Sequence, residues 1–452
     1  MSPSTVLVLG LAVVLALPLL WRALARPRRF DPFEPIVLFV GAYGTVFVVR
    51  PSSMLLGGDL SYAGVDLRET LPLVNLLALC GAVAFLVGYE LRPGASLARR
   101  LPSPRPVATR PAVAWSLAFV ALAALAIAAR ASGLAGGSDQ LGAASVSSDY
   151  VLYVGFLVLP AALCLVALAL RQARGRLWLL ALLVLAASLA QLVPQGRRIF
   201  LLPLLGGILV FVYVYRRKRP SLPALLALVV VGLVASYAAV VVREPERRAD
   251  AASQFANIVR RPDEVFGLIL ERGDAEMAPV LAGALTAVPE RTGYEWGRIT
   301  LGGLVARPIP RQLWHEKPRP VSDSIVSVVW PEYVGTTFRP AFTPLLSFYW
   351  DFGIAGVIVG MGIFGVACRV LYEWFLGHRG EFAAQLIFAA SVWYVVVGVR
   401  NDPADTVALA SFVVLPLLLV ARFSGPTPAR RWRPLWGRHG ERDRRPAPAR
   451  WS

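Results

Sequence analysis

The chain has 452 residues, of which 56% are hydrophobic and only 16% are charged. Soluble domains carry about a quarter charged residues, so this composition excludes an ordinary water-soluble globular protein. The formal net charge of +18 does not indicate a nucleic-acid partner, because the basic residues lie between apolar segments and do not share one soluble face. Lipid is therefore the expected solvent for most of the chain.

The apolar runs show no strand-like alternation, so the spanning elements are expected to be helices. Runs long enough to cross about 30 Å of hydrocarbon predict an all-α polytopic membrane protein of about eleven transmembrane helices, with a range of roughly ten to twelve. The predicted spans are residues 5–20, 36–49, 71–88, 112–129, 151–170, 177–193, 199–215, 222–242, 345–372, 382–399 and 404–421. No basic residue precedes the first run, which favours a retained helix over a cleaved signal peptide.

Lys and Arg gather in alternate connections, after the first, third, fifth and seventh predicted spans. Cytoplasmic connections are enriched in these residues, so the pattern predicts an N-terminus outside and a C-terminus in the cytoplasm. The C-terminal segment 423–452 is rich in Pro and Arg and is predicted to be a basic, disordered cytoplasmic tail near anionic lipid.

The spans divide the chain into four parts. Residues 1–242 hold eight predicted helices, 243–342 form one large extracytoplasmic loop, 343–422 hold three more helices, and 423–452 are the tail. Within the loop, residues 263–272 and 279–290 have the apolar spacing of helices, so the loop is expected to be partly helical and to fold against the membrane.

Signatures of common soluble enzymes are missing, since the chain has no P-loop, no dinucleotide-binding glycine pattern and no His-Glu-x-x-His motif. A nucleotide substrate is therefore not expected. Cys80, Cys164 and Cys368 lie within apolar runs without metal-ligand spacing, so neither a disulfide framework nor a zinc site is predicted.

Two basic residues stand where the charge rule predicts none. Arg197 and Arg198 occupy a short outer turn between the sixth and seventh predicted spans. Guanidinium groups bind phosphate bidentately, so pyrophosphate binding is one interpretation. Snorkelling to lipid headgroups, or capping of the seventh helix, is the other.

Three stretches carry a resemblance to a known family. They are 293–297 (GYEWG), 309–318 (IPRQLWHEKP), and 342–344 (FTP) leading into 348–353 (FYWDFG). Together with the long outer loop before the last few helices, they resemble the oligosaccharide repeat unit polymerases, the Wzy-type O-antigen polymerases. Arg291 and Gly302 also have the R-x10-G spacing described for some polymerases of this type.

The resemblance implies a glycosyltransferase of polysaccharide biosynthesis in the cell envelope. It implies transfer of a glycan from undecaprenyl pyrophosphate to a sugar hydroxyl of an incoming lipid-linked repeat unit, on the outer face of the bacterial cytoplasmic (inner) membrane. No metal, nucleotide sugar or other cofactor is then expected. The implied partners are undecaprenyl-pyrophosphate-linked glycans and membrane lipid, with a chain-length regulator and a flippase as possible protein partners.

Such a transfer needs a base for the acceptor hydroxyl and cations for the departing pyrophosphate. His315 is the only histidine of three expected outside, and Glu295, Glu316 and Asp351 are the carboxylate candidates. The candidate pyrophosphate ligands are Arg197, Arg198, Arg291, Arg298, Arg311 and Lys317. The candidate glycan-binding aromatics are Tyr294, Trp296 and Trp314. For each of these residues a structural or solvated role is the competing interpretation.

Three other classes stay open, and one of them is a non-enzymatic scaffold in envelope assembly. An O-antigen ligase would use the same donor with a different acceptor. A transporter or flippase would place charged groups at the midplane of its helices, whereas here the charged residues gather outside the apolar runs.

Overall fold

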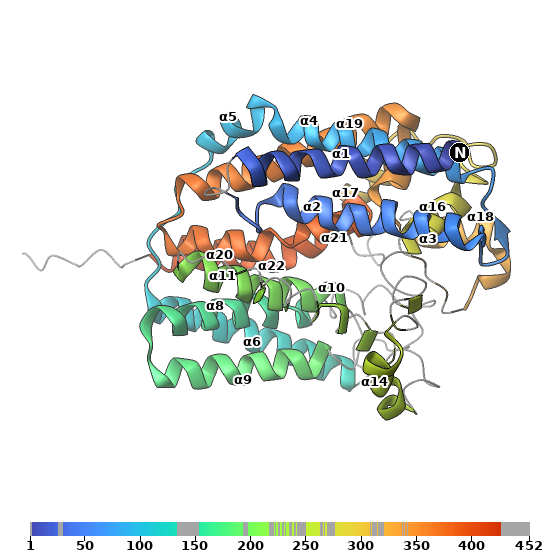
Figure 1. The fold of residues 1–452 in the computed structure, drawn as a ribbon. Helices are drawn as coiled ribbons and strands as arrows, with labels where there is room; N and C mark the ends of the chain where they lie inside the picture. The colour runs from blue at the N-terminus through green and yellow to red at the C-terminus, as the bar shows by residue number, and fades with distance from the viewer. Residues whose placement is uncertain are drawn as a thin grey trace, which may run out of the picture.

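The computed structural model describes residues 2–25, 30–132, 153–192, 198–216, 276–307, 321–336 and 342–425, short stretches between 221 and 268, and the single residues 309, 314, 338 and 340. Over these residues the chain is an all-α multi-pass membrane protein (Figure 1). Nine helices in this part of the chain are long and apolar enough to cross a membrane.

Some spans are single helices and others join several elements. The single-helix spans are α1 (Pro3–Ala25), α4 (Leu71–Glu90), α6 (Thr109–Ala131), α9 (Gly175–Leu192) and α22 (Pro403–Phe423). The composite spans contain α2 (Pro35–Gly44), the π-helical turn η2 (Thr45–Val49) and α3 (Arg50–Gly57); α8 (Val158–Gln172); α19 (Pro344–Gly377); and α20 (Phe382–Ser391) with α21 (Tyr394–Arg400).

Shorter elements connect the spans. They are β1 (Ser61–Tyr62), β2 (Val65–Asp66), α5 (Arg92–Arg100), α10 (Arg198–Leu201), η3 (Leu202–Gly206), α11 (Gly207–Arg216), α14 (Ala251–Arg260), α16 (Met277–Leu285), η5 (Arg298–Gly302), α17 (Gly303–Ala306), α18 (Val321–Val329) and η6 (Pro331–Tyr333). The two strands pair as a small antiparallel hairpin.

The first six and the last three predicted spans are confirmed as helices long enough to cross a membrane. The second continues to Gly57, beyond its predicted end at residue 49, because η2 carries the helix on without a break. The seventh is a shorter apolar helix, Pro203–Arg216, and most of the eighth, residues 222–242, lies outside the described residues.

The bundle has two ends with different chemistry. Figure 1 shows the N-terminus, α3, α16 and α18 together at one end, called the loop end below. The opposite end, called the tail end, holds α5 (Figure 1). Successive spans run alternately toward one end and the other. The N-terminus and the large loop were predicted on the same side of the membrane, and both lie at the loop end.

Close helix packing joins α4 to α19, and glycines make it possible. A Cβ added at Gly88 would meet the backbone carbonyl of Gly362, and one added at Gly365 would meet the carbonyl of Phe85. Membrane helices without a hydrophobic driving force between them associate through such small-residue contacts. The α4–α19 pair is therefore the rigid centre of this half of the bundle.

The helix α19 is not straight. Phe352 and Gly353 leave helical geometry, and Gly353 has φ 63° and ψ −150°, a conformation that essentially only glycine adopts. A Cβ added at Gly360 would lie 2.6 Å from the Phe348 ring. Twelve helical residues span about 18 Å along a straight helix, so residues 344–351 must fold back against the segment that follows Gly353. We call this unit the α19 hairpin.

The hairpin corrects the predicted ninth span. The prediction treated residues 345–372 as one crossing, but the part before Gly353 doubles back. The side chain of Leu345 lies beside Gly81, near the middle of α4, so the chain reaches into the bundle before it returns toward the loop end. Apolar length alone could not reveal this, because both arms of the hairpin are apolar.

The predicted hydrophilic loop also contains a core helix. Every residue of α16 is buried, and Gly283 lies against the fully buried Trp330, with a Cβ at Gly283 placed 2.6 Å from that ring. The helix belongs to the same apolar cluster as α4 and the α19 hairpin. This part of the segment 243–342 is thus helical and buried at the loop end of the bundle.

Candidate functional site

A tight turn at residues 293–297 docks on the bend of the α19 hairpin. The amide of Glu295 donates to the Trp350 carbonyl at 3.0 Å, and the amide of Trp296 donates to the Asp351 carbonyl at 3.2 Å. Gly293, Trp296 and Gly297 all have positive φ, at 71°, 49° and 91°. Glycine adopts this left-handed conformation without steric cost, so Gly293 and Gly297 let the turn approach the α19 hairpin closely. The docking geometry therefore explains the two glycines of the GYEWG sequence.

Asp351 holds the next element in place. Its carboxylate is fully buried and accepts hydrogen bonds from the amides of Ile299 at 3.0 Å and Thr300 at 2.8 Å. These amides lie in the first turn of η5, where helical N–H groups lack partners within the helix. Both carboxylate oxygens are thereby engaged. The geometry makes Asp351, named above as a candidate base, a positioning residue.

A second anchor lies at the other end of this segment. Arg307 forms an ion pair with Asp405 and lies 3.9 Å from the carboxylate of Asp402. Asp402 in turn caps α22 by accepting from the amides of Ala404 at 2.8 Å and Asp405 at 3.1 Å. The segment 293–307 is therefore held between the α19 hairpin and the start of α22.

This second anchor was not predicted from the sequence. The available signal was a pair of aspartates, Asp402 and Asp405, at the start of an otherwise apolar span. That pattern is also typical of simple helix capping, and nothing in the sequence indicates that Arg307 would be its partner.

The turn and the hairpin together form an aromatic pocket of about 310 Å³. Its walls are Tyr294, Trp296, Tyr349, Phe352, Gly353 and Ile354. The rings meet edge to face, with centroid separations of 6.3 Å for Trp296–Phe352 and 6.4 Å for Tyr294–Tyr349. Trp296 is 76% exposed, so its indole face is available to a ligand. Two predicted glycan-binding residues thus lie in one pocket.

Charged residues adjoin the walls of this aromatic pocket in sequence, although none of them lines it. Glu295, which stands between its two aromatic walls in sequence, pairs with Arg298 at 3.3 Å, and the Arg298 side chain is mostly exposed. Arg291 is also exposed. The turn that supplies Tyr294 and Trp296 to the pocket therefore also carries a partly buried carboxylate, and exposed guanidinium groups stand beside it in sequence.

The structure does not describe five of the other predicted site residues, namely Arg197, Arg311, His315, Glu316 and Lys317. Arg198 begins α10, which Figure 1 places toward the loop end, but its side chain also lies outside what is described. Trp314 is partly exposed at 37%. The expected meeting of Arg197 and Arg198 with the loop therefore stays a prediction.

Metal-ligating residues do not cluster in the described part of the chain. Among those residues, no group of three or more His, Cys, Asp or Glu could hold a metal ion. Cys164 and Cys368 are buried, and both are free thiols.

No protein-family model, curated protein or solved structure matches the chain. The fold and the site define an all-α multi-pass membrane protein with an aromatic pocket and adjoining charges at the loop end of its helical bundle.

Proposed function

We propose that this protein is a membrane glycosyltransferase that polymerises undecaprenyl-pyrophosphate-linked oligosaccharide repeat units into a surface polysaccharide. The observation that carries the proposal is the aromatic pocket beside Glu295 and Arg298. Aromatic faces pack on the apolar faces of sugars, and exposed guanidinium groups suit a pyrophosphate. A pocket at one end of an apolar bundle suits a substrate whose lipid stays in the membrane.

The proposed reaction exchanges one bond for another. The acceptor hydroxyl oxygen forms a bond to the anomeric carbon of the donor glycan, while the bond from that carbon to the pyrophosphate oxygen breaks. The hydroxyl proton passes to a base, and the electron pair of the broken bond leaves with the lipid pyrophosphate. The site must therefore accept a proton and stabilise developing negative charge.

Glu295 is the described residue best placed to be the base. In the free protein its carboxylate pairs with Arg298, 3.3 Å away. A bound pyrophosphate would compete for the Arg298 guanidinium and so release the carboxylate for the acceptor hydroxyl. Arg298 and Arg291 would stabilise the departing group, Tyr294 and Trp296 would hold the glycan, and Asp351 would position the turn. His315 stays a candidate base, and Arg197, Arg198, Arg311 and Lys317 stay candidate ligands.

The proposal also assigns a sidedness. The loop end would face the outside of a bacterial cytoplasmic membrane and the tail end the cytoplasm, as the distribution of Lys and Arg predicts. Lipid-linked repeat units delivered by a flippase would then meet the aromatic pocket directly, and a chain-length regulator would act on the same side.

A transporter or flippase of lipid-linked or polar substrates is the second candidate. The α19 hairpin favours it, because transporters often build binding sites from interrupted helices. The location of the aromatic pocket at the end of the bundle favours the transferase. An O-antigen ligase would share the same donor chemistry and differ in its acceptor.

The deciding experiment supplies the purified full-length protein with one lipid-linked repeat unit and follows glycan length. Products with two or more repeats on one lipid support the polymerase. Transfer only to an added second lipid or protein acceptor would identify a ligase. Movement of the intact lipid-linked unit across a vesicle membrane, with no new glycosidic bond, would identify a flippase.

A further inference from the structure

A second, larger pocket lies at the tail end, far from the aromatic pocket along the helices. It encloses about 740 Å³ between the last turns of α1, α4 and α19. Three carboxylates and two guanidinium groups line it, Glu34, Glu90, Glu373, Arg22 and Arg369, together with apolar side chains. Because polar and apolar walls meet here, the pocket is suited to an amphipathic ligand.

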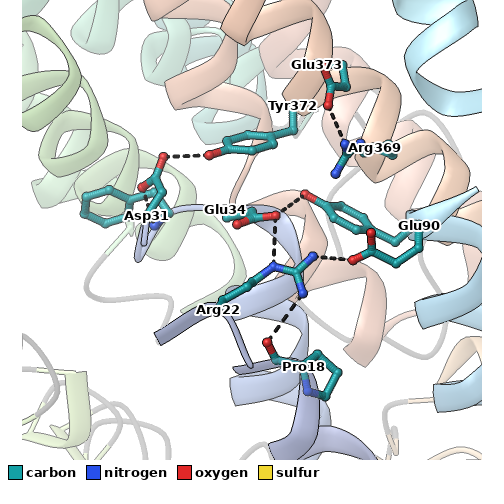
Figure 2. A network of polar contacts seen from close by, with 10 residues as sticks. Pro18, Arg22, Asp31, Glu34, Glu90, Arg369, Tyr372 and Glu373 are labelled. Atoms are coloured by element: carbon teal, nitrogen blue, oxygen red, sulfur yellow. Dashed lines mark hydrogen bonds and ion pairs between the residues drawn. The ribbon is translucent and has the colours of Figure 1, made fainter. Parts of the chain in front are cut away.

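Arg22 organises one polar wall. Its guanidinium pairs with Glu34 at 3.4 Å and with Glu90, and donates to the Pro18 carbonyl at 3.4 Å (Figure 2). Tyr89 donates its hydroxyl proton to the same Glu34 oxygen at 3.0 Å. Glu34 is therefore held on two sides, whereas the Glu90 side chain is 56% exposed and able to accept further hydrogen bonds.

α19 supplies the opposite polar wall. Arg369 pairs with Glu373 at 2.6 Å, one turn apart on the helix, and Tyr372 donates to Asp31 at 3.1 Å (Figure 2). The Arg369 guanidinium lies 5.3 Å from the centre of the Tyr89 ring. Each wall thus presents a carboxylate beside a guanidinium, and the carboxylates outnumber the guanidinium groups.

The apolar wall continues onto a lipid-facing surface. Leu17 and Trp21 of α1 line the pocket and are 58% and 67% exposed, as expected of side chains that face hydrocarbon. Leu86 and Leu376 line it from α4 and α19. A lipid in the surrounding membrane could therefore place its headgroup between the charged walls while its acyl chains stay along α1.

We propose that the tail-end pocket binds a phospholipid whose headgroup carries a primary amine, of the phosphatidylethanolamine type. The ammonium would donate to Glu90 and Glu373, and the phosphate would lie near Arg22 and Arg369, so each headgroup charge meets its opposite. An anionic headgroup without an amine would add negative charge to a pocket in which carboxylates already outnumber guanidinium groups. A trimethylated ammonium has no N–H to donate. This inference does not depend on the proposed transferase activity.

The test measures lipid retention by the purified full-length protein. Native mass spectrometry after addition of equal amounts of phosphatidylethanolamine, phosphatidylcholine and phosphatidylglycerol should show the amine lipid retained about tenfold more than either competitor, as expected for hydrogen bonds to charged groups. Equal retention of the three lipids by the unaltered protein would overturn the proposal, and this comparison needs no variant.

A double substitution, Glu90→Gln with Glu373→Gln, should abolish the preference while the protein stays folded. Glu381→Gln is the matched control, because Glu381 is an exposed carboxylate that does not line the pocket. A preference that survives the double substitution would overturn the proposal. Loss of the preference in the Glu381→Gln control would also overturn the proposal. It would show that the lipid preference arises from the total charge of the tail end and not from the pocket.

Discussion

The Asp351 carboxylate on α19 accepts a 2.8 Å hydrogen bond from the amide of Thr300, 51 residues earlier in the chain. This contact joins η5, which directly follows the turn at 293–297, to the bend of the α19 hairpin.

Replacing Asp351 with Asn should destabilise the protein by about 2–3 kcal/mol, because one amide oxygen cannot replace a carboxylate that accepts from two backbone amides. Activity should fall with it, while the pH dependence of the remaining activity stays unchanged. Thermal unfolding and glycan-lengthening assays check both. Glu332→Gln, at an exposed loop-end carboxylate, is the control. Full stability with abolished activity would instead restore Asp351 as a base.

Glu295→Gln should lower kcat about a hundredfold or more, the usual effect of removing a general base, without lowering the unfolding temperature. The side chain is only partly buried and its ion pair with Arg298 is mostly exposed, so little stability depends on it. The exposed neighbour Glu290, changed to Gln, should leave kcat within a factor of two or so. Wild-type turnover in the Glu295 variant would remove it from the mechanism.

Trp296→Ala should raise KM for the lipid-linked glycan by roughly five- to tenfold, with a smaller effect on kcat, because an exposed stacking face is lost. Trp296→Phe should recover part of the affinity. Leu301→Ala removes another exposed apolar side chain, from the adjoining η5 turn, and should leave KM unaltered. An unchanged KM in Trp296→Ala would show that glycan binds elsewhere.

Gly353→Ala should cost about 1–3 kcal/mol of stability, since its φ of 63° and ψ of −150° are strained for any residue with a Cβ. A thiol-reactive dye can follow unfolding, because Cys164 and Cys368 are buried in the folded protein. Gly41→Ala is the control, since a Cβ there meets nothing within 4 Å. Equal unfolding temperatures for the two variants would contradict the hairpin geometry.

Burial raises the pKa of Glu34 above its ordinary value, against the opposing effects of Arg22 and Tyr89. A raised pKa in the folded state means that protonation favours folding, so this contribution is present at low pH and is lost as pH rises through the folded-state pKa. Glu34→Gln should therefore reduce the loss of stability between mildly acidic and neutral pH, measured by intrinsic fluorescence. Glu69→Gln, at an exposed position, should leave that dependence unchanged.

Much of the fold follows from the sequence alone. Apolar length against bilayer thickness is a local property, so nine of the eleven spans predicted from the sequence are confirmed within the described residues. The stretch 293–297 was also singled out in the sequence, as one of the three that carry the family resemblance.

Only the tertiary structure decided how these pieces meet. The sequence could not show that the first arm of α19 folds back, that α16 enters the core, or that Arg307 pairs with Asp405, because each depends on residues distant in the chain. The tail-end pocket is the extreme case, since Tyr372 meets Asp31 across 341 residues. Composition and apolar length were enough to predict that the chain lies in lipid and that its spans are helices. Packing determined which polar side chains share a site, since that depends on which helix ends become neighbours.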